Sequence, residues 1–446
     1  MRHVAQILVG LLVLRLTLMA TVPVFEPSEA RYAAIAANMA RSGDFVVPHF
    51  THNFAYQSFD GKPPLVFQAG GLFVKALGTD AAWKLQLAVR LFPLLSALLA
   101  LAILFYAVRR FADAETARLA VVICASCTAF YAAAGISMTD MTLTCCVAGA
   151  LLLYRCFAEP APSGGRPYGL GFAAGVAALL GAGMITKGPV ALVMFGLPVL
   201  LDAAVNRRWK ALLNVRWLAV APVFLLVAAP WFVLVERVNP GSVWYFFYNE
   251  NFLRFVSHDY GDKYGAGREA FRGVSVLWAL VATLPWSLVL FGRLSRIRRL
   301  RLPASLDLMG PLAFRSFECL ALVAIVGFWC LTSRVLVYYL FPVVPLFAAF
   351  LAQQGDRARL MRLAPWAAGI SALVLAVGLV GGALFSEKMQ GPRTAFSPKE
   401  NHYAVEFYHG RKSDAELAPH RKAWEARQEA WRLYRLKQKE RENGGR

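Results

Sequence analysis

Apolar stretches of roughly twenty residues, separated by polar connections, follow one another along most of the chain. A helix of this length crosses a hydrocarbon core of roughly 30 Å and satisfies its own backbone hydrogen bonds without water, whereas a β-barrel would show short alternating segments. We therefore predict about eleven membrane-spanning helices. The predicted spans are 4–24, 88–107, 115–135, 141–157, 169–186, 189–204, 217–235, 274–292, 316–332, 336–352 and 366–385.

The first apolar stretch, 4–24, has two interpretations. Arg2 precedes it, which is typical of a cleaved signal peptide. The stretch is longer than the apolar region of a typical signal peptide, and Pro23 and Pro27 make a poor small-residue cleavage site. We expect it to be retained as a membrane span.

Two connections, 25–87 and 236–273, are longer than the others and carry most of the polar side chains. Residues 29–39 have the apolar spacing of a short amphipathic helix, which we expect to lie on the membrane surface. Ser28 can cap this helix, and Glu29 stands near its positive end. Capping alone would explain part of this motif.

The fold class that follows is all-α: a polytopic membrane domain over 1–386 with juxtamembrane helices in its outer loops, and a basic polar tail over 387–446. Composition agrees, because 58% of the 446 residues are hydrophobic, only 17% are charged and the mean hydropathy is +0.49. A soluble domain is about half apolar and about a quarter charged.

Clusters of Arg and Lys fall between alternate pairs of spans and predict the orientation of the chain. The clusters contain Arg109, Arg110, Arg207, Arg208, Lys210, Arg216, Arg293, Arg296, Arg298, Arg299, Arg301, Arg357, Arg359 and Arg362. This side should be cytoplasmic, so the loops 25–87 and 236–273 should face outward. The net charge of +20 is therefore explained by basic residues at the cytoplasmic ends of the spans, and we expect no nucleic acid as a partner.

The tail is the exception to this charge pattern. Residues 415–442 have the spacing of a charged helix with a thin apolar stripe. An odd number of spans would place the tail outside, against its own positive charge. Either it lies on anionic lipid at the outer face, or one span is miscounted.

The seven cysteines fall in or beside predicted spans. Cys124 and Cys127 have the spacing of a redox or metal pair, but no second pair and no His is near them in the sequence. Cys is also a small apolar packing residue. We expect all seven to pack within the membrane domain.

Several ionisable side chains cluster in the first outer loop. Glu26 and Glu29 precede Arg31 and Tyr32, and Lys62 stands before two prolines near the end of the loop. The prolines stiffen the backbone beside Lys62, which favours a fixed ammonium as a phosphate partner.

Later connections carry four further candidates. Asp140 borders hydrocarbon, where a carboxylate is costly unless it is paired or functional; it could also be a helix cap. Lys187 and Arg334 stand in outer turns, where they could extend to the interface or form a cationic pocket for a phosphate or diphosphate. His258 is either a polar loop residue or a metal ligand.

These motifs, in this order, resemble a family. Pro-Ser-Glu-Ala-Arg-Tyr-Ala at 27–33, Ser-Gly-Asp-Phe-Val-Val-Pro-His-Phe at 42–50 and Lys-Pro-Pro at 62–64 look like the first outer loop of the aminoarabinose transferases that modify lipid A. The wider relatives are protein O-mannosyltransferase-like enzymes of the GT-C superfamily. Further matching segments are 139–141, 186–189, 251–255, 285–286 and 334–342.

The resemblance implies an inverting glycosyltransferase that takes a sugar from a polyprenyl-phosphate donor and passes it to a lipid A-like, other lipid, glycan or protein acceptor. Lys62 and Arg334 would hold the donor phosphate, and Asp140 would be an active-site carboxylate. The remaining residues that would line the substrate pocket are Arg31, Tyr32, Lys187, Tyr338 and Tyr339. No cofactor is required, although His258 corresponds to a loop histidine that binds a metal in some relatives.

Two departures from the family pattern affect these roles. The family has Asp-Glu where this chain has Ser28-Glu29, so Glu26 or Glu29 would replace the expected catalytic Asp, or an already ionised phosphate acceptor would need no base. The family also places Glu before the lysine of Lys-Pro-Pro, where this chain has Gly61, which weakens the metal assignment.

Two functions outside this class stay open. A flippase or transporter would place ionisable residues inside the membrane, and Arg15 within the first span is such a residue. A noncatalytic envelope scaffold would be consistent with Ser28 in place of the catalytic acid.

Overall fold

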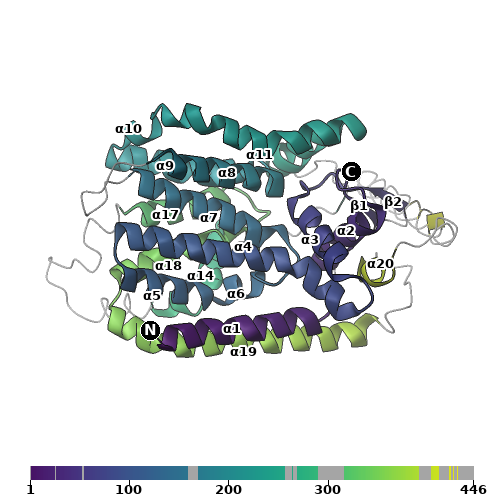
Figure 1. Cartoon of the computed structure of the whole chain (residues 1–446), viewed down its shortest axis with the longest axis horizontal. Helices are drawn as coiled ribbons and strands as arrows, with labels where there is room; N and C mark the ends of the chain where they lie inside the picture. Colours follow the sequence, from purple (N-terminus) through teal and green to yellow (C-terminus); the bar gives the residue numbers. More distant parts are fainter. Residues whose placement is uncertain are drawn as a thin grey trace, which may run out of the picture.

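The computed structural model describes residues 2–25, 27–52, 55–158, 169–256, 264, 269–289, 316–390, 403–410, 421, 422, 425 and 429. Helices built from the long apolar stretches lie side by side and form a bundle (Figure 1). Six of the described helices are long and apolar enough to cross a membrane: α1 (Arg2–Thr21), α4 (Ala82–Phe111), α7 (Thr139–Ala158), α8 (Leu170–Lys187), α11 (Arg216–Val238) and α19 (Arg357–Gln390). The chain is a multi-pass membrane protein, as predicted.

Shorter helices complete the bundle. They are α5 (Ala114–Ala125), α6 (Thr128–Ala133), α9 (Val190–Asn206), α10 (Trp209–Leu212), α14 (Val274–Ala282), α17 (Phe317–Cys330), the 3₁₀ helix η2 (Val337–Leu340) and α18 (Val343–Gln354). Each of the predicted spans overlaps one of the bundle helices. Three are interrupted: 115–135 is divided into α5 and α6 by a turn, 336–352 is divided into η2 and α18, and α14 ends well before residue 292.

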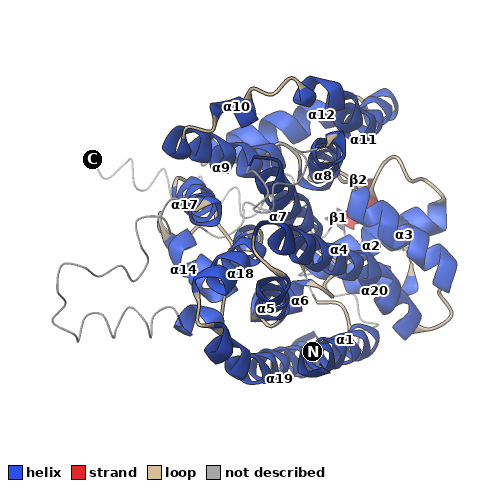
Figure 2. Cartoon of the chain, turned by 60° about the vertical axis from the view of Figure 1, so that its left-hand side comes forward, coloured by secondary structure: helices blue, strands red, loops and turns tan. Residues whose placement is uncertain are grey.

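Helix α7 forms the centre of the bundle (Figure 2). It packs against α4, α8, α9 and α18, and 89% of its most apolar window is buried inside the protein. Cys145 and Cys146 lie on this helix, and all seven cysteines are free and buried or partly buried. The prediction that they are packing residues is confirmed.

The first outer loop folds into a compact unit at one end of the bundle (Figure 1, right). It contains α2 (Ser28–Ser42), α3 (Leu65–Leu77) and an antiparallel hairpin of β1 (His49–His52) and β2 (Ala55–Ser58), with His49 opposite Ser58. Helix α2 is largely buried because α3 and α20 (Tyr403–His409) cover it, so it does not lie on a membrane surface as we expected. Ser28 makes no side-chain cap; Pro27 is the N-cap residue.

The second long loop, 236–273, contains α12 (Ser242–Trp244), the π-helix η1 (Tyr245–Leu253) and α13 (Arg254–Val256). At the opposite end of the bundle lies α10, which contains Lys210 and follows directly after Arg207 and Arg208 (Figure 1). The basic connection thus lies away from the polar outer loops, as the charge pattern predicts.

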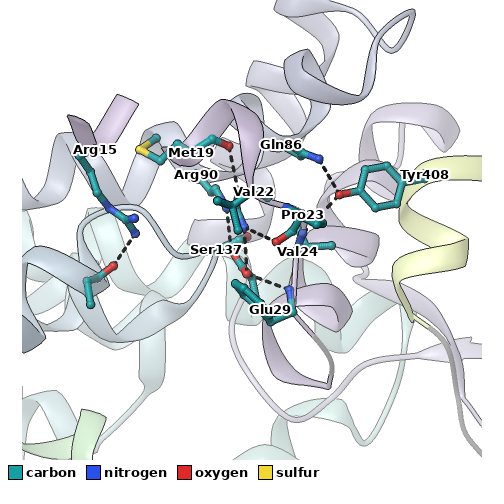
Figure 3. Close-up of polar contacts among 12 residues, drawn as sticks. Arg15, Met19, Val22, Pro23, Val24, Glu29, Gln86, Arg90, Ser137 and Tyr408 are labelled. Atoms are coloured by element: carbon teal, nitrogen blue, oxygen red, sulfur yellow. Dashed lines mark hydrogen bonds and ion pairs between the residues drawn. The ribbon is translucent and has the colours of Figure 1, made fainter. Parts of the chain in front are cut away.

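A buried ion pair fixes the outer unit to the bundle (Figure 3). Arg90 of α4 donates from Nε to Glu29 Oε1 at 2.8 Å and from Nη2 to Glu29 Oε2 at 3.1 Å, and each residue is 3% exposed. Arg90 also donates to the carbonyls of Met19, Val22 and Pro23, at the end of α1. The pair therefore holds the α1–α2 junction against α4.

We predict that Glu29→Gln lowers the free energy of unfolding by about 3–5 kcal/mol, because Arg90 would stay buried with its charge uncompensated. Thermal unfolding of the purified protein in detergent, followed by tryptophan fluorescence, measures the change. The control is Lys84→Gln, which breaks an exposed pair between Lys84 Nζ and Asp80 Oδ2 at 2.8 Å and should leave the melting temperature unchanged. Equal effects of the two variants would contradict a structural role for Glu29.

Candidate functional site

A polar cavity of about 80 Å³ lies where the outer unit meets the ends of α7 and α8. Its lining residues come from seven separate parts of the chain. They are Ser28, Arg31, Tyr32, Phe59, Gly61, Lys62, Met138, Thr139, Asp140, Lys187, Glu250, Arg254, Tyr264, Tyr338 and Tyr339. Seven of the residues selected from the sequence are therefore in one place.

Asp140 and Lys187 form a buried pair at the base of the cavity. Lys187 Nζ donates to Asp140 Oδ1 at 2.6 Å, and the two residues are 8% and 3% exposed. Asp140 lies in the first turn of α7, where the helix dipole favours a carboxylate, and Lys187 is the last residue of α8. The Lys187 ammonium also lies 4.2 Å from the ring centroid of Tyr339. The pair explains how Asp140 is tolerated beside hydrocarbon.

Gly188 allows this arrangement directly after Lys187. Its φ of +78° is a left-handed conformation that favours glycine, and a Cβ atom there would lie 2.4 Å from the ring of Phe246. Lys-Gly-Pro is therefore a turn that ends α8 while keeping Lys187 in the cavity.

Lys62 enters the cavity from the loop between β2 and α3. Its Nζ donates to the carbonyl of Gly61 at 2.7 Å and lies 3.6 Å from Glu250 Oε2. Burial lowers the pKa of Lys62 to about 8, partly opposed by the charge of Glu250, while Arg254, Lys187 and Arg31 lower it further. Lys62 is therefore an ammonium at neutral pH that loses its proton in mildly alkaline solution.

Glu250 and Arg254 also line the cavity, although neither is among the site residues predicted from the sequence. Arg254 Nη1 lies 2.9 Å from Glu250 Oε2, and Tyr245 donates to Glu250 Oε1 at 3.2 Å. The sequence does contain a signal, since residues 250 and 254 have the spacing of a helical ion pair and 251–255 matches the family motif. The π-helix that carries Glu250, and that ends directly before Arg254, was not predictable from apolar periodicity.

Arg31 occupies an aromatic cage at the edge of the cavity. Its guanidinium carbon lies 5.4 Å from the ring centroid of Tyr32, 5.6 Å from that of Phe59 and 5.9 Å from that of Tyr403. Its Nε is buried without a hydrogen-bond partner among the residues that the structure describes. A partly buried guanidinium whose Nε–H group has no partner among the described residues is suited to receive an anion.

An apolar groove of about 290 Å³ adjoins the polar cavity. The two share Lys62, Lys187, Glu250, Arg254 and Tyr339. The remaining groove residues are mostly apolar: Pro189, Val190, Val193, Asn251, Phe252, Phe255, Val256, Phe328, Trp329, Thr332 and Arg334. A charged cavity and an apolar groove are thus in direct contact.

Arg334 lines the groove but not the polar cavity. Arg334 Nη2 lies 3.1 Å from Glu269 Oε1, and Nε of the same guanidinium donates to that oxygen at 3.2 Å. A ligand that reaches from the cavity into the groove can therefore contact both Lys62 and Arg334.

Glu29, a predicted catalytic residue, does not line the cavity. Glu29 points away, into its pair with Arg90, and also accepts from the backbone N–H groups of Phe25 and Ser137. Glu26 and His258 lie outside the described residues. The two carboxylates that line the described cavity are therefore Asp140 and Glu250, and both are paired with cations.

The described residues do not fit a divalent metal site. Within the described ranges, no group of three or more His, Cys, Asp or Glu side chains is placed to hold a metal ion. The metal role of His258 stays a prediction, and we assign no step to a metal.

Arg15, which favoured a transporter, is fixed by the bundle. It is 2% exposed and its Nη2 donates to the carbonyl of Ala132 at 2.6 Å, just before the end of α6 (Figure 3). It does not line the polar cavity.

Residues 62–233 match the family model described as dolichyl-phosphate-mannose-protein mannosyltransferase. A similar relative is the undecaprenyl phosphate-α-4-amino-4-deoxy-L-arabinose arabinosyl transferase 2 of Sodalis glossinidius, 34% identical over 279 residues, or 62% of this chain and 47% of the relative. The transferase of that name from Erwinia tasmaniensis is 28% identical over 335 residues, or 74% of this chain and 55% of the relative. The chain spans about half the length of the curated relatives it matches.

The fold is similar to that of ArnT from Cupriavidus metallidurans. Its apo structure superposes with a TM-score of 0.69 at 18% identity, covering 91% of this chain and 84% of ArnT. Its structure bound to undecaprenyl phosphate gives a TM-score of 0.66 at 18% identity, covering 94% of this chain and 88% of ArnT. The chain therefore has a fold similar to that of ArnT and, over part of its length, a sequence similar to those of undecaprenyl phosphate-linked aminoarabinose transferases.

Proposed function

We propose that this protein is an inverting glycosyltransferase that moves a sugar from a polyprenyl-phosphate donor to a lipid A-like or other cell-envelope acceptor. The observation that carries the proposal is the excess of positive charge in a small cavity that adjoins an apolar groove. Four cationic side chains and two carboxylates line the described cavity, which leaves two positive charges in excess. This arrangement is suited to an amphiphile with a phosphate head and an apolar tail.

The sequence relatives and the solved structure support this donor class. The curated relatives are named for an undecaprenyl phosphate-linked aminosugar, and one ArnT structure is bound to undecaprenyl phosphate. Basic residues around α10, at the far end of the bundle, support a cytoplasmic position for that end and a periplasmic position for the cavity.

Direct displacement at the anomeric carbon is the reaction that the cavity favours. The acceptor oxygen forms a bond to that carbon while the bond to the phosphate oxygen breaks, and the phosphate leaves with the bonding electron pair. Lys62, Arg254 and Arg31 lie where they can stabilise the charge that collects on the phosphate. The sugar configuration is inverted because attack and departure occur on opposite faces.

The acceptor's proton limits which acceptors are suitable. Ser28 lines the cavity where the family pattern has an acid, and Glu29 points away from it. A hydroxyl acceptor would need Asp140 or Glu250, both of which are paired with cations, to receive its proton, whereas an ionised phosphate acceptor has no proton to lose. The geometry therefore favours a phosphate group, such as that of a lipid A-like molecule, as acceptor.

We predict that Lys62→Ala and Asp140→Asn each reduce sugar transfer by about 100-fold or more. Lys62→Ala removes a cation that stabilises the leaving phosphate, and Asp140→Asn leaves Lys187 buried without its counter-charge. The full-length protein in lipid nanodiscs would be incubated with labelled undecaprenyl-phosphate aminoarabinose and lipid A, and the label on lipid A measured. Lys75→Ala and Asp113→Asn are matched controls, since Lys75 contacts Phe45 outside the cavity and Asp113 caps α5.

Normal turnover in Lys62→Ala or Asp140→Asn would contradict the role of that residue. If the wild-type protein in vesicles moves the donor across the bilayer without forming a new glycosidic bond, the protein is a transporter and the proposal is wrong.

We predict that affinity for undecaprenyl phosphate falls as pH rises through about 8. Affinity falls because the lowered pKa of Lys62 is about 8, and above this pH the side chain loses the positive charge that binds phosphate. Affinity should be roughly tenfold weaker at pH 9.5 than at pH 7.5, a range over which the phosphate itself stays doubly ionised. Equilibrium binding in nanodiscs measures it.

Two variants test the assignment of this fall to Lys62. Lys62→Arg should bind equally at both pH values, because a guanidinium keeps its charge. Glu250→Gln should move the fall to lower pH, because the Glu250 charge raises the Lys62 pKa. If the affinity of Lys62→Arg falls between pH 7.5 and pH 9.5 as much as that of the wild type, a group other than Lys62 is responsible for the pH dependence.

A further inference from the structure

Helix α20, near the C-terminal end of the chain, packs against α2 although more than 360 residues separate the partners. No motif or spacing in the sequence connects the tail with the site. The α20 residue Tyr408 accepts a hydrogen bond from Gln86 of α4 at 2.9 Å and one from the backbone of Val24 at 3.3 Å (Figure 3). This end of α20 is thus attached to the α1–α2 junction and to the bundle.

Glu406 attaches α20 to α2 and β1. It is 6% exposed and accepts from Asn38 Nδ2 at 2.7 Å and from the backbone N–H of Thr51 at 2.9 Å. Arg41 of α2 donates to the carbonyls of Glu406 and Phe407 at 3.2 and 2.6 Å. A buried carboxylate with several donors fixes the position of the helix that carries it.

Tyr403 begins α20 and lies beside Arg31, which lines the cavity. It is 5% exposed, and its hydroxyl lies 2.8 Å from His52 Nδ1. Its ring stacks on that of His52 with an interplanar angle of 12°, and it forms one wall of the cage around Arg31. The other two walls, Tyr32 and Phe59, come from the outer loop itself.

We propose that Tyr403, held in place by Glu406, is a positioning residue that directs Arg31 toward the donor phosphate, so that the C-terminal segment completes the site. A guanidinium enclosed by three aromatic faces has few alternative rotamers and little bound water, which leaves its N–H groups available to an anion. Removing one wall would let Arg31 move and become hydrated. This inference rests on the proposed function, because it assumes that a polyprenyl phosphate is the ligand.

Binding of undecaprenyl phosphate to the full-length protein in nanodiscs tests the proposal. Tyr403→Met removes the aromatic face but keeps apolar volume, and we expect affinity to fall roughly fivefold. Tyr403→Phe keeps the ring and loses the hydroxyl that lies 2.8 Å from His52 Nδ1, so its affinity should stay within about twofold of wild type.

A double-mutant comparison separates positioning from a general structural effect. In the Arg31→Gln background, Tyr403→Met should change affinity little, because the side chain through which Tyr403 acts is absent. Glu406→Ala, which releases α20 through different contacts, should show the same dependence on Arg31. It therefore tests the proposal again if Tyr403→Met does not fold.

Each outcome decides a separate point. If Tyr403→Met reduces the affinity for undecaprenyl phosphate equally in the wild-type and Arg31→Gln backgrounds, α20 acts only on stability and the proposal is overturned. A loss confined to the KM for lipid A, with donor affinity unchanged, would also overturn it. If the wild-type protein does not bind undecaprenyl phosphate, both the proposed function and this inference are refuted. If the wild-type protein binds it and Tyr403→Met binds it equally well, only the role of Tyr403 is refuted.

Discussion

The pair between Glu29 and Arg90 determines where the outer unit stands on the membrane bundle. Two charges are excluded from water next to hydrocarbon, so each is stable only while the other is in place. Glu29 is also the second residue of α2, two positions before Arg31, and it accepts from the backbone of Ser137 just before α7 begins. Because the same carboxylate contacts α4 and the segment that leads into α7, α2 is aligned with Asp140. The cavity depends on that alignment.

The charges inside the cavity are compensated in the same way, because each buried charge needs a partner of opposite sign. Asp140 neutralises Lys187, and Glu250 is shared by Lys62 and Arg254, so the burial of these cations is tolerated without a ligand. Arg31 is stabilised by aromatic rings and keeps a buried N–H group without a partner among the described residues. A phosphate that enters would compete with Glu250 for two cations and would supply the partner that this N–H group of Arg31 lacks. Binding would then be an exchange of ion pairs.

The sequence predicted those parts of the fold and site that depend on local composition. Apolar length identified the spans, and motif positions identified Lys62, Asp140, Lys187 and the Tyr338–Tyr339 pair as cavity residues. Predictions from the sequence were wrong or incomplete where the role of a residue depends on a partner that is distant in the chain. Glu29 was assigned to catalysis because nothing in the first loop reveals Arg90, 61 positions away. Glu250 was missed because its direction is set by a π-helix, and α2 was expected at a surface because α20 is remote in the sequence.

The position of α20 also indicates whether the number of membrane spans is odd or even. Helix α1 begins at the end of the bundle opposite α2, whereas α20 packs beside α2 (Figure 1). The chain must therefore cross the bundle an odd number of times between these points, which agrees with about eleven spans and not with a miscount by one. Positive charge in a tail opposes such a placement only weakly, since the orientation rule acts on short loops next to spans. The buried hydrogen bonds of Glu406 and the packing of Tyr403 favour the docked position directly, so specific contacts outweigh net charge here.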